Sequence, residues 1–429
     1  MKQTFTLAFT LLFFSVTTFA QEPEQWSRFR GPNGQGISTA TGLPTQWSDT
    51  ENIAWKTPIP GGHSWSSPVI WNDHIFLTTT TDDGRECRVV AFDRKNGEIL
   101  WNTMVFTQAL QPMNPENSHA TPTPVTDGER VYVLFANGRF AALDFAGEIV
   151  WANNHTYYSG HGLGTSPMLY GDLLITAINP SVDPNNNPNN LPQRAGWQLP
   201  WDQSYLLALD KNTGDEKWRT MRGMTRISHS VPVVIQVDGK DQILSMVGDV
   251  IQGFEPATGE LIWTVRSDGE PAVPTPAIGT DGVIFACTIG PITAVRTNGR
   301  GDVTDTHVLW TQGQNRPIIS SFLYVKPILF AAEDSGSVAA LDEATGEILW
   351  RLRLQGRPKS SPIYAEGKVY FTTHVGITTI VKLNEGDIKQ PGEVIAVNDI
   401  GETIHATLAV AGKQIFIRTD KELWCIGKE

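Results

Sequence analysis

The chain has 429 residues, and its 33 Lys and Arg against 45 Asp and Glu give a formal net charge of −12. This acidity argues against a phosphate-binding surface, so nucleic acid is not an expected partner. The 39 Gly, 27 Pro and 14 Trp are typical of many short strands joined by tight turns and exclude a fold built from long helices.

The first 20 residues have the features of a signal peptide. Lys2 precedes an apolar run over residues 5–14, and Thr18 and Ala20 put small residues at −3 and −1 for cleavage before Gln21. The run is too short to span a membrane comfortably, and no Cys follows it to carry a lipid. We expect cleavage after Ala20 and a soluble, monomeric, periplasmic or secreted protein with no membrane insertion.

Residues 21–51 are predicted to be an N-terminal arm. Glycines and a proline in 31–36 forbid a regular element, while Trp26 and Phe29 need cover, so we expect an ordered arm on the body. Residues 52–60 then resemble the outer, Trp-bearing strand of a repeat that lacks its other three strands.

Residues 52–429 form a repeat array. In 339–350 one strand ends, Asp342 begins a turn, Gly346 closes it with a positive φ, and the next strand leads to Trp350. This hairpin pattern returns at the turns that end in Trp101, Trp151, Trp218 and Trp263.

Each unit opens with small residues and usually a proline, and there are eight such entries. They are 66–68, 122–124, 165–167, 230–232, 274–276, 320–322, 360–362 and 406–408. The eighth unit ends at 425–427, one strand short, and the strand around Trp55 supplies what it lacks. The predicted fold is therefore all-β: an eight-bladed β-propeller of four-stranded antiparallel blades, closed by an N-terminal strand that joins the last blade.

The recurring tryptophans are predicted to be structural. An outer-strand indole can pack on the neighbouring blade and donate its N–H to a backbone carbonyl. The residues with this predicted docking role are Trp55, Trp101, Trp151, Trp218, Trp263, Trp310 and Trp350.

Two insertions interrupt the repeats, and three cysteines lie far apart. Residues 179–203 separate the second and third strands of the third unit, and residues 297–306 lengthen the last turn of the fifth. Cys87, Cys287 and Cys425 each fall in a predicted strand, which favours buried thiols. Ring closure would bring the first and last units together, so a disulfide between Cys87 and Cys425 remains an alternative to two buried thiols.

The units resemble the pyrroloquinoline-quinone (PQQ) repeat family, whose blades carry an Ala-x-Asp-x-x-Thr-Gly-x-x-x-Trp docking motif; the match covers roughly residues 52–428. The start of the chain, from Phe29 to Gly36, looks like that of a group of exported bacterial PQQ-like proteins. Better-understood relatives are the quinoprotein alcohol dehydrogenases, which bind PQQ and Ca²⁺, and the BamB propeller lipoproteins, which bind partners. The sequence lacks the adjacent cysteines of the former and the lipid-bearing Cys of the latter, so the resemblance implies the fold and leaves the function open.

Five of the nine histidines fall in connections that enter the innermost strands, where they would share one mouth of the ring. One interpretation is a polar funnel for an anionic or polyhydroxylated ligand; the alternative is that these side chains only bond loop carbonyls. The candidate ligand-binding residues are His63, Trp65, His119, His161, His229, Arg316, Arg357 and His405. No two histidines have a chelating spacing, so no metal site is predicted.

These observations lead to a binding or scaffold module as the predicted function, with a protein partner or a polar small molecule such as a carbohydrate. No cofactor is expected and no catalytic residue is assigned. One alternative is a PQQ-dependent oxidoreductase of alcohols or sugars, with PQQ and Ca²⁺ as cofactors. A further alternative is a carbohydrate-active enzyme at the His-lined mouth.

Overall fold

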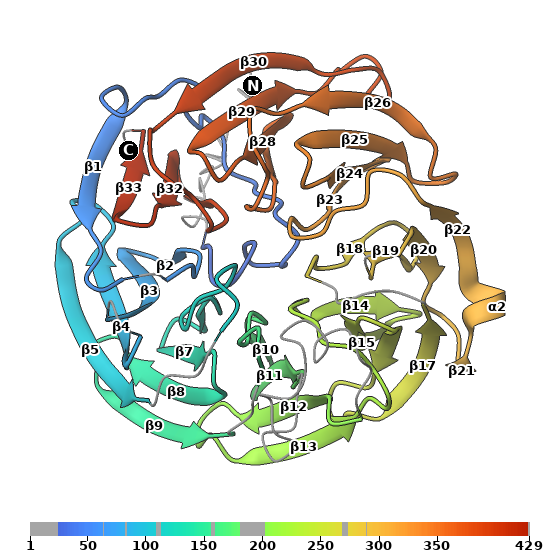
Figure 1. Ribbon diagram of the computed structural model, residues 1–429, viewed down its shortest axis with the longest axis horizontal. Coiled ribbons are helices and arrows are strands. Elements are labelled where there is room, and N and C mark those ends of the chain that lie inside the picture. Colours follow the sequence, from blue (N-terminus) through green and yellow to red (C-terminus); the bar gives the residue numbers. More distant parts are fainter. Residues whose placement is uncertain are drawn as a thin grey trace, which may run out of the picture.

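Eight antiparallel sheets stand around a central axis and form a closed ring (Figure 1). The structure, a computed structural model, describes residues 25–62, 64–81, 84–108, 113–155, 159–180, 202–267, 273–288 and 290–427. Each sheet is one blade, and the predicted eight-bladed propeller is confirmed.

The first four blades follow the chain in order, from the innermost to the outermost strand. Blade 1 is β2 (Val69–Trp71), β3 (His74–Thr80), β4 (Glu86–Asp93) and β5 (Ile99–Thr107). Blade 2 is β6 (Val125–Thr126), β7 (Arg130–Phe135), β8 (Arg139–Asp144) and β9 (Ile149–Asn154). Blade 3 is β10 (Met168–Tyr170), β11 (Leu173–Ile178), β12 (Tyr205–Asp210) and β13 (Glu216–Met221). Blade 4 is β14 (Val233–Val237), β15 (Lys240–Val247), β16 (Val250–Phe254) and β17 (Leu261–Arg266).

The second half repeats this order until the last blade, which takes its outer strand from the other end of the chain. Blade 5 is β18 (Ala277–Ile278), β19 (Val283–Cys287), β20 (Ile292–Arg296) and β22 (Val308–Gln312). Blade 6 is β23 (Leu323–Val325), β24 (Ile328–Ala332), β25 (Ser337–Asp342) and β26 (Ile348–Arg353). Blade 7 is β27 (Ile363–Ala365), β28 (Lys368–Thr372), β29 (Ile377–Lys382) and β30 (Glu393–Asp399). Blade 8 is β31 (Ala409–Ala411), β32 (Gln414–Arg418), β33 (Glu422–Ile426) and β1 (Ile53–Pro58).

The hairpin at Asp342 has the predicted chemistry. Asp342 Oδ1 accepts the backbone N–H groups of Ala344 (2.9 Å) and Thr345 (3.2 Å), and Gly346 has φ 71°. The pairing register between β25 and β26 shifts after Ala340, as expected of a turn followed by a bulge. The short side chain of Asp and the freedom of Gly therefore set this turn.

Residues 297–306 do more than lengthen a turn. β21 (Gly301–Asp302) pairs in parallel with β17 and adds a fifth strand to blade 4, and the single-turn α2 (Thr304–His307) follows it. The insertion predicted for blade 5 thus covers the outer edge of its neighbour. The other insertion, 179–203, lies largely outside the described residues, as do Trp197 and Trp201.

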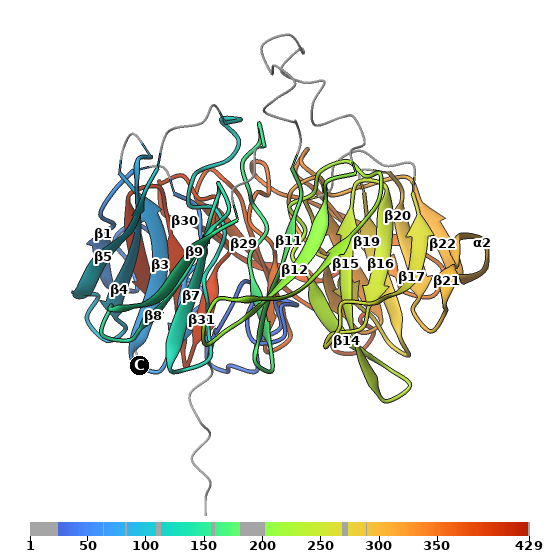
Figure 2. The ribbon, with the colours of Figure 1, turned by 90° about the horizontal axis from the view of Figure 1, so that it is seen from below.

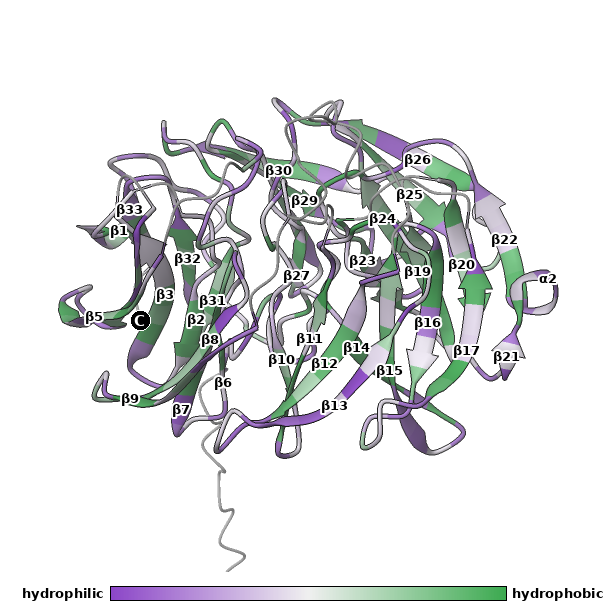
Figure 3. Cartoon of the chain, turned by 60° about the horizontal axis from the view of Figure 1, so that its bottom comes forward, coloured by the Kyte–Doolittle hydropathy of each residue, from purple (hydrophilic) through white to green (hydrophobic). Residues whose placement is uncertain are grey.

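The hydrophobic core is divided among the interfaces between blades. Six clusters of buried side chains each join two neighbouring blades, and the largest joins blades 7, 8 and 1 with the arm. Inner and middle strands are buried on both faces, and hydrophobic residues gather along them within the blades (Figure 3). No blade therefore has a complete core without its neighbours.

The arm runs through the middle of the ring and is not confined to its outside (Figures 1 and 2). Its backbone or side chains bond to the innermost strand, or the entry to it, in six blades. The bonds join Trp26 to Ile70, Ser27 to Thr126, Arg28 to Pro232, Gln35 to Ile278, Arg30 to Phe322, and Gly36 and Ser38 to Tyr364. The innermost strands are sheet edges that face the axis, so the arm supplies partners to backbone groups that no further strand could pair.

Candidate functional site

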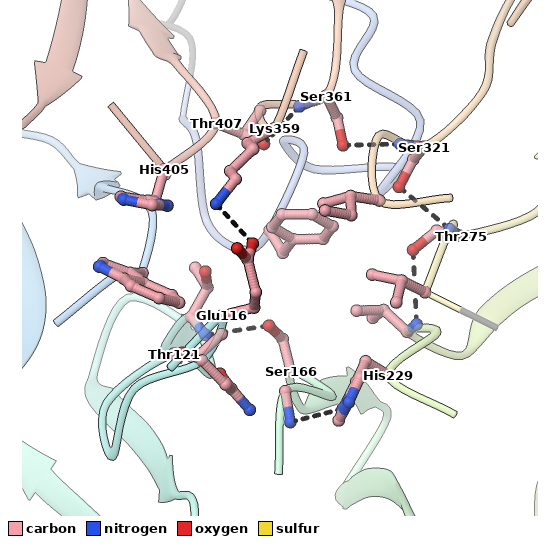
Figure 4. A pocket seen from close by; sticks show the side chains of 18 of the residues that line it. Glu116, Thr121, Ser166, His229, Thr275, Ser321, Lys359, Ser361, His405 and Thr407 are labelled. Atoms are coloured by element: carbon pink, nitrogen blue, oxygen red, sulfur yellow. Dashed lines mark hydrogen bonds and ion pairs between the residues drawn. The ribbon is translucent and has the colours of Figure 1, made fainter. Parts of the chain in front are cut away.

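A cavity of about 530 Å³ lies on the axis, at the end where the innermost strands begin. Its wall is made by the entry segments of the blades (Figure 4). Phe29 of the arm also lines the cavity, and we call the side that the arm supplies its floor. The cavity is within the size range of sites for small organic molecules.

Seven hydroxyl groups surround this pocket in a ring. In seven of the eight entries the residue before the proline, or before the residue in its place, is Ser or Thr. Each hydroxyl oxygen accepts the backbone N–H of the equivalent residue in the preceding blade, and in every case it is buried. The bonds run from Ser67 to Thr123 (2.9 Å), Thr123 to Ser166 (2.9 Å), Val231 to Thr275 (3.4 Å), Thr275 to Ser321 (3.0 Å), Ser321 to Ser361 (3.1 Å), Ser361 to Thr407 (3.0 Å) and Thr407 to Ser67 (3.0 Å).

This hydroxyl ring is interrupted once, between blades 3 and 4. Val231 has no hydroxyl to accept the N–H of Ser166, and two histidines stand near the gap. His229 Nδ1 accepts the N–H of Gly164 at 3.0 Å, and the rings of His161 and His229 lie 6.4 Å apart. Burial, and to a lesser extent the nearby His161, lowers the pKa of His229 to about 3; burial also lowers the pKa of His161. Both imidazoles are neutral at pH 7.

An aromatic platform forms the opposite side of the pocket. The rings of Trp65 and His405 are 4.1 Å apart and inclined by only 12°, so they are stacked. Trp65 belongs to the entry of blade 1 and His405 to that of blade 8, where the two ends of the propeller meet.

Two ion pairs bring charge to the pocket. Lys359 Nζ lies 2.6 Å from Glu116 Oε2, and Arg357 Nη2 lies 2.9 Å from Asp334 Oδ2. The first pair joins the entries of blades 7 and 2, and Figure 4 shows the two side chains pointing toward one another. The hydrogen bond from Lys359 lowers the pKa of Glu116, which keeps the carboxylate charged at neutral pH.

Two arginines of the arm flank the floor residue Phe29. Arg28 and Arg30 are buried, and within the described part of the chain their guanidinium groups donate to the backbone carbonyls of Pro232, Phe322 and Gln35. Burial lowers the pKa of Arg28 to about 10 and, together with the charge of Arg28, that of Arg30 to about 9. Both guanidinium groups are therefore charged at pH 7.

A family model described as "Outer membrane protein assembly factor BamB" matches residues 35–178, 201–304 and 300–420. The chain belongs to this PQQ-repeat propeller family. Comparison with curated protein sequences found no match.

Solved structures of the same fold include both of the expected kinds of relative. BamB from Moraxella catarrhalis is 14% identical with a TM-score of 0.59, over 87% of this chain and 98% of that one. A quinohemoprotein alcohol dehydrogenase from Comamonas testosteroni is 11% identical with a TM-score of 0.63, over 94% and 81%. A europium-containing methanol dehydrogenase is 11% identical with a TM-score of 0.53, over 95% and 98%. At these identities the likeness concerns the fold alone.

Within this family member, the structure brings five of the eight candidate ligand-binding residues to the pocket wall. They are Trp65, His161, His229, Arg357 and His405. His119 and Arg316 do not line the cavity, and His63 lies outside the described residues.

Sequence reasoning missed several lining residues. The hydroxyl ring had a readable signal, because Ser or Thr precedes the proline position in nearly every entry. Glu116, Asp334 and Lys359 had none: Lys359 and Glu116 are 243 residues apart and belong to loops that no repeat motif describes. The role of Phe29 depends on the path of the arm, which the blade pattern does not contain.

The tryptophans with a predicted docking role divide into two groups. The indole N–H groups of Trp55, Trp101, Trp151 and Trp310 donate to a carbonyl in the next blade's turn, at 3.0, 2.9, 2.8 and 2.9 Å. Trp218 lies against the turn glycine Gly259 without such a bond. Trp263 is fully buried and bonds Gln242 of its own blade, while the buried N–H of Trp350 has no partner.

The described residues contain no group of three or more His, Cys, Asp or Glu side chains that could hold a metal ion. None of the helices in that part of the chain is long and apolar enough to cross a membrane.

Proposed function

We propose that this protein is a binding module whose axial pocket takes a ring-shaped polar molecule of carbohydrate size. The observation that carries the proposal is the stacked Trp65–His405 platform beside a 530 Å³ pocket ringed by seven hydroxyls. A pyranose has an apolar face that packs on an aromatic ring and hydroxyls at its edge that exchange hydrogen bonds with polar side chains.

PQQ with Ca²⁺ does not suit the residues of this pocket. PQQ carries three carboxylates, which uncharged donors alone would not neutralise, and the two cations among the described lining residues, Arg357 and Lys359, are already paired with carboxylates. Ca²⁺ takes six to eight oxygen ligands, usually with carboxylates among them, and the described residues contain no group of three or more His, Cys, Asp or Glu side chains that could hold it. We therefore derive no redox step, and the oxidoreductase alternative receives no support from the site.

A protein-binding role is the second candidate, since the matched family is named for an assembly factor. The observation that favours it is a repeated one: in five blades the outer strand has an exposed aliphatic residue at its first or second position. These residues are Ile99, Leu100, Ile149, Val150, Leu261, Leu309 and Val394. Exposed apolar residues at equivalent places in these blades would suit a partner that follows the outside of the ring.

Calorimetric titration of the mature chain tests the pocket proposal and the conclusion about PQQ. We expect one neutral pyranose from a panel of hexoses to bind stoichiometrically and His405→Ala to weaken this binding; His119→Ala, an entry histidine outside the cavity, is the matched control. If no sugar binds, or both variants weaken binding equally, the pocket proposal is wrong. PQQ with Ca²⁺ is one arm of the panel, and its saturable binding would contradict the conclusion about the cofactor.

We also propose that the protein works outside the cytoplasm, which rests on residues 1–20 of the sequence. Expression in a bacterium with its natural N-terminus should yield a protein in the periplasm or medium that begins at Gln21. A cytoplasmic protein that keeps Met1 would contradict this.

A further inference from the structure

The side-chain polar groups that surround the axial pocket are mostly hydrogen-bond donors. The oxygen of every hydroxyl in the ring is already used as an acceptor, whereas none of these hydroxyls donates its own proton to another described residue. Their residues are at most 4% exposed, and they line the cavity. Buried donors without partners are costly, and a ligand in the pocket would satisfy them.

The two neutral imidazoles add donors at the gap in the ring. His229 Nδ1 accepts from Gly164, and His161 Nδ1 lies 3.3 Å from the amide nitrogen of Asn114, which can only donate. Because each neutral ring then carries its proton on Nε2, both present an N–H group.

Several acceptor oxygens of the pocket are already occupied. Glu116 Oε2 and Asp334 Oδ2 are in ion pairs, and the amide oxygens of Asn114 and Asn117 accept backbone N–H groups, while Asp334 Oδ1 is buried without a partner. The hydroxyl donors of the ring therefore outnumber this one unpaired acceptor, and a ligand that brings acceptors is matched to most of this wall.

Charge beneath the floor favours the same kind of ligand. Neither Arg28 nor Arg30 forms an ion pair with a described carboxylate, and Arg28 Nε, Arg30 Nε and Arg30 Nη1 are buried without hydrogen-bond partners. Two uncompensated charges in a poorly solvated interior produce a positive potential that extends several ångströms. Phe29, between them in sequence, lines the pocket.

Together, the donor ring and the buried arginines lead us to propose that the natural ligand carries an oxyanion. The anionic group is a carboxylate that sits over the hydroxyl ring near Phe29, and the ligand class is the sugar acids. This rests on the proposed function, because it specifies the chemistry of a molecule in the same pocket. Neutral donors bind an anion more strongly than an uncharged acceptor, so the charge distinguishes this ligand from a plain sugar.

The test compares D-glucuronate with D-glucose, which differ at one carbon, by calorimetry at pH 7 with the mature chain. We expect glucuronate to bind about tenfold or more tightly than glucose, the difference that one charge-assisted hydrogen bond makes. Inorganic phosphate is the third ligand, and it shows whether any oxyanion binds as tightly as glucuronate.

Two variants test the parts separately. Thr275→Val removes one hydroxyl at the longest bond of the ring, 3.4 Å, where the fold depends on it least; Thr275→Ser keeps the hydroxyl as its control. Arg28→Met removes one buried charge and a single 3.4 Å bond. We expect both Thr275→Val and Arg28→Met to weaken glucuronate about tenfold, Arg28→Met to leave glucose unchanged, and Thr275→Ser to retain glucuronate binding. Thermal unfolding of each variant verifies that it is folded.

The outcomes distinguish this inference from the proposed function. If glucose binds as tightly as glucuronate and Arg28→Met changes neither, the oxyanion inference is wrong and the sugar-binding function stands. If phosphate binds as tightly as glucuronate, the sugar-acid class is wrong. If none of the probes binds, both proposals fail. Should Arg28→Met not fold, Thr275→Val with its serine control still decides the question.

Discussion

At the scale of single residues, equivalent tryptophans have different energetic roles because their surroundings differ. Trp310 donates its N–H to Glu343 of the next blade, whereas Trp350 is 8% exposed and its N–H has no partner. In blade 7 the sequence that would form the matching turn departs from the repeat, so the usual acceptor is missing.

This difference predicts opposite tolerance to phenylalanine. Trp310→Phe leaves a carbonyl without its donor and should reduce the free energy of unfolding by about 1–2 kcal/mol. Trp350→Phe removes an unpaired donor and keeps an aromatic ring, so it should change stability by less than about 1 kcal/mol, while Trp350→Ala should lose about 3–5 kcal/mol. Urea unfolding measures all three, and equal losses for the two Phe variants would refute the distinction.

His229 predicts a dependence of stability on pH. Burial lowers the pKa of His229 in the folded chain to about 3, below the usual value of about 6.5. Between these two pH values the imidazole is protonated in the unfolded chain and neutral in the folded chain. The free energy of unfolding should therefore fall as the pH drops from about 6.5 towards 3. The interval from pH 6.5 to 5 is diagnostic, because carboxylates titrate mostly below it. His229→Gln should flatten the slope there, and an unchanged slope would contradict the assignment.

At the scale of elements, the closure of the ring is the feature on which the fold depends most. The sequence predicts that residues 52–60 pair with the strand near 423–426, and β1 does pair with β33, from Ile53 opposite Ile426 to Pro58 opposite Glu422. This could be predicted because a missing strand at one end and an orphan strand at the other have only one arrangement that leaves no exposed edge.

Two truncations separate the contribution of β1 from that of the arm. A chain that begins at Glu51 lacks the axial contacts but keeps β1, and it should remain monomeric with a lower unfolding temperature. A chain that begins at Gly61 also loses β1, which exposes the edge of β33, so it should aggregate. Size-exclusion chromatography and thermal unfolding compare them. Identical behaviour of the two chains would mean that β1 adds nothing to closure.

The site could be predicted less completely than the fold, for a physical reason. Blade hairpins are local and repeat, so their turn residues and hydrophobic alternation are visible in the sequence. The pocket is assembled from non-repeating loops, and its pairs form between segments such as those of Glu116 and Lys359, which only the closed ring brings together. Val231 interrupts the hydroxyl ring. Its importance becomes visible only when it is compared with the Ser or Thr at the same position in the other seven entries.

At the scale of the whole molecule, the ring holds together without covalent links. All three cysteines lie in described strands, are buried and form no disulfide, which answers the open question of Cys87 and Cys425. Burial raises the pKa of Cys87 to about 12, so its thiol stays protonated and inert. The unfolding temperature should be the same with and without a reductant, and a thiol reagent should label the protein only after unfolding. A reductant-sensitive transition would contradict this.

The path of the arm has a consequence for the order of folding. Arg30 reaches Phe322, 292 positions later in the chain, and Gly36 and Ser38 bond Tyr364 of blade 7. During synthesis these partners are made long after the arm itself, so this part of the arm has no partners on the axis until blades 6 and 7 have formed, although Trp26 can pair with Ile70 of blade 1 earlier. This part of the arm, although made early, is thus among the last segments to find its place. Until the arm is in place the pocket lacks its floor, so we expect the protein to bind its ligand only once the ring is complete.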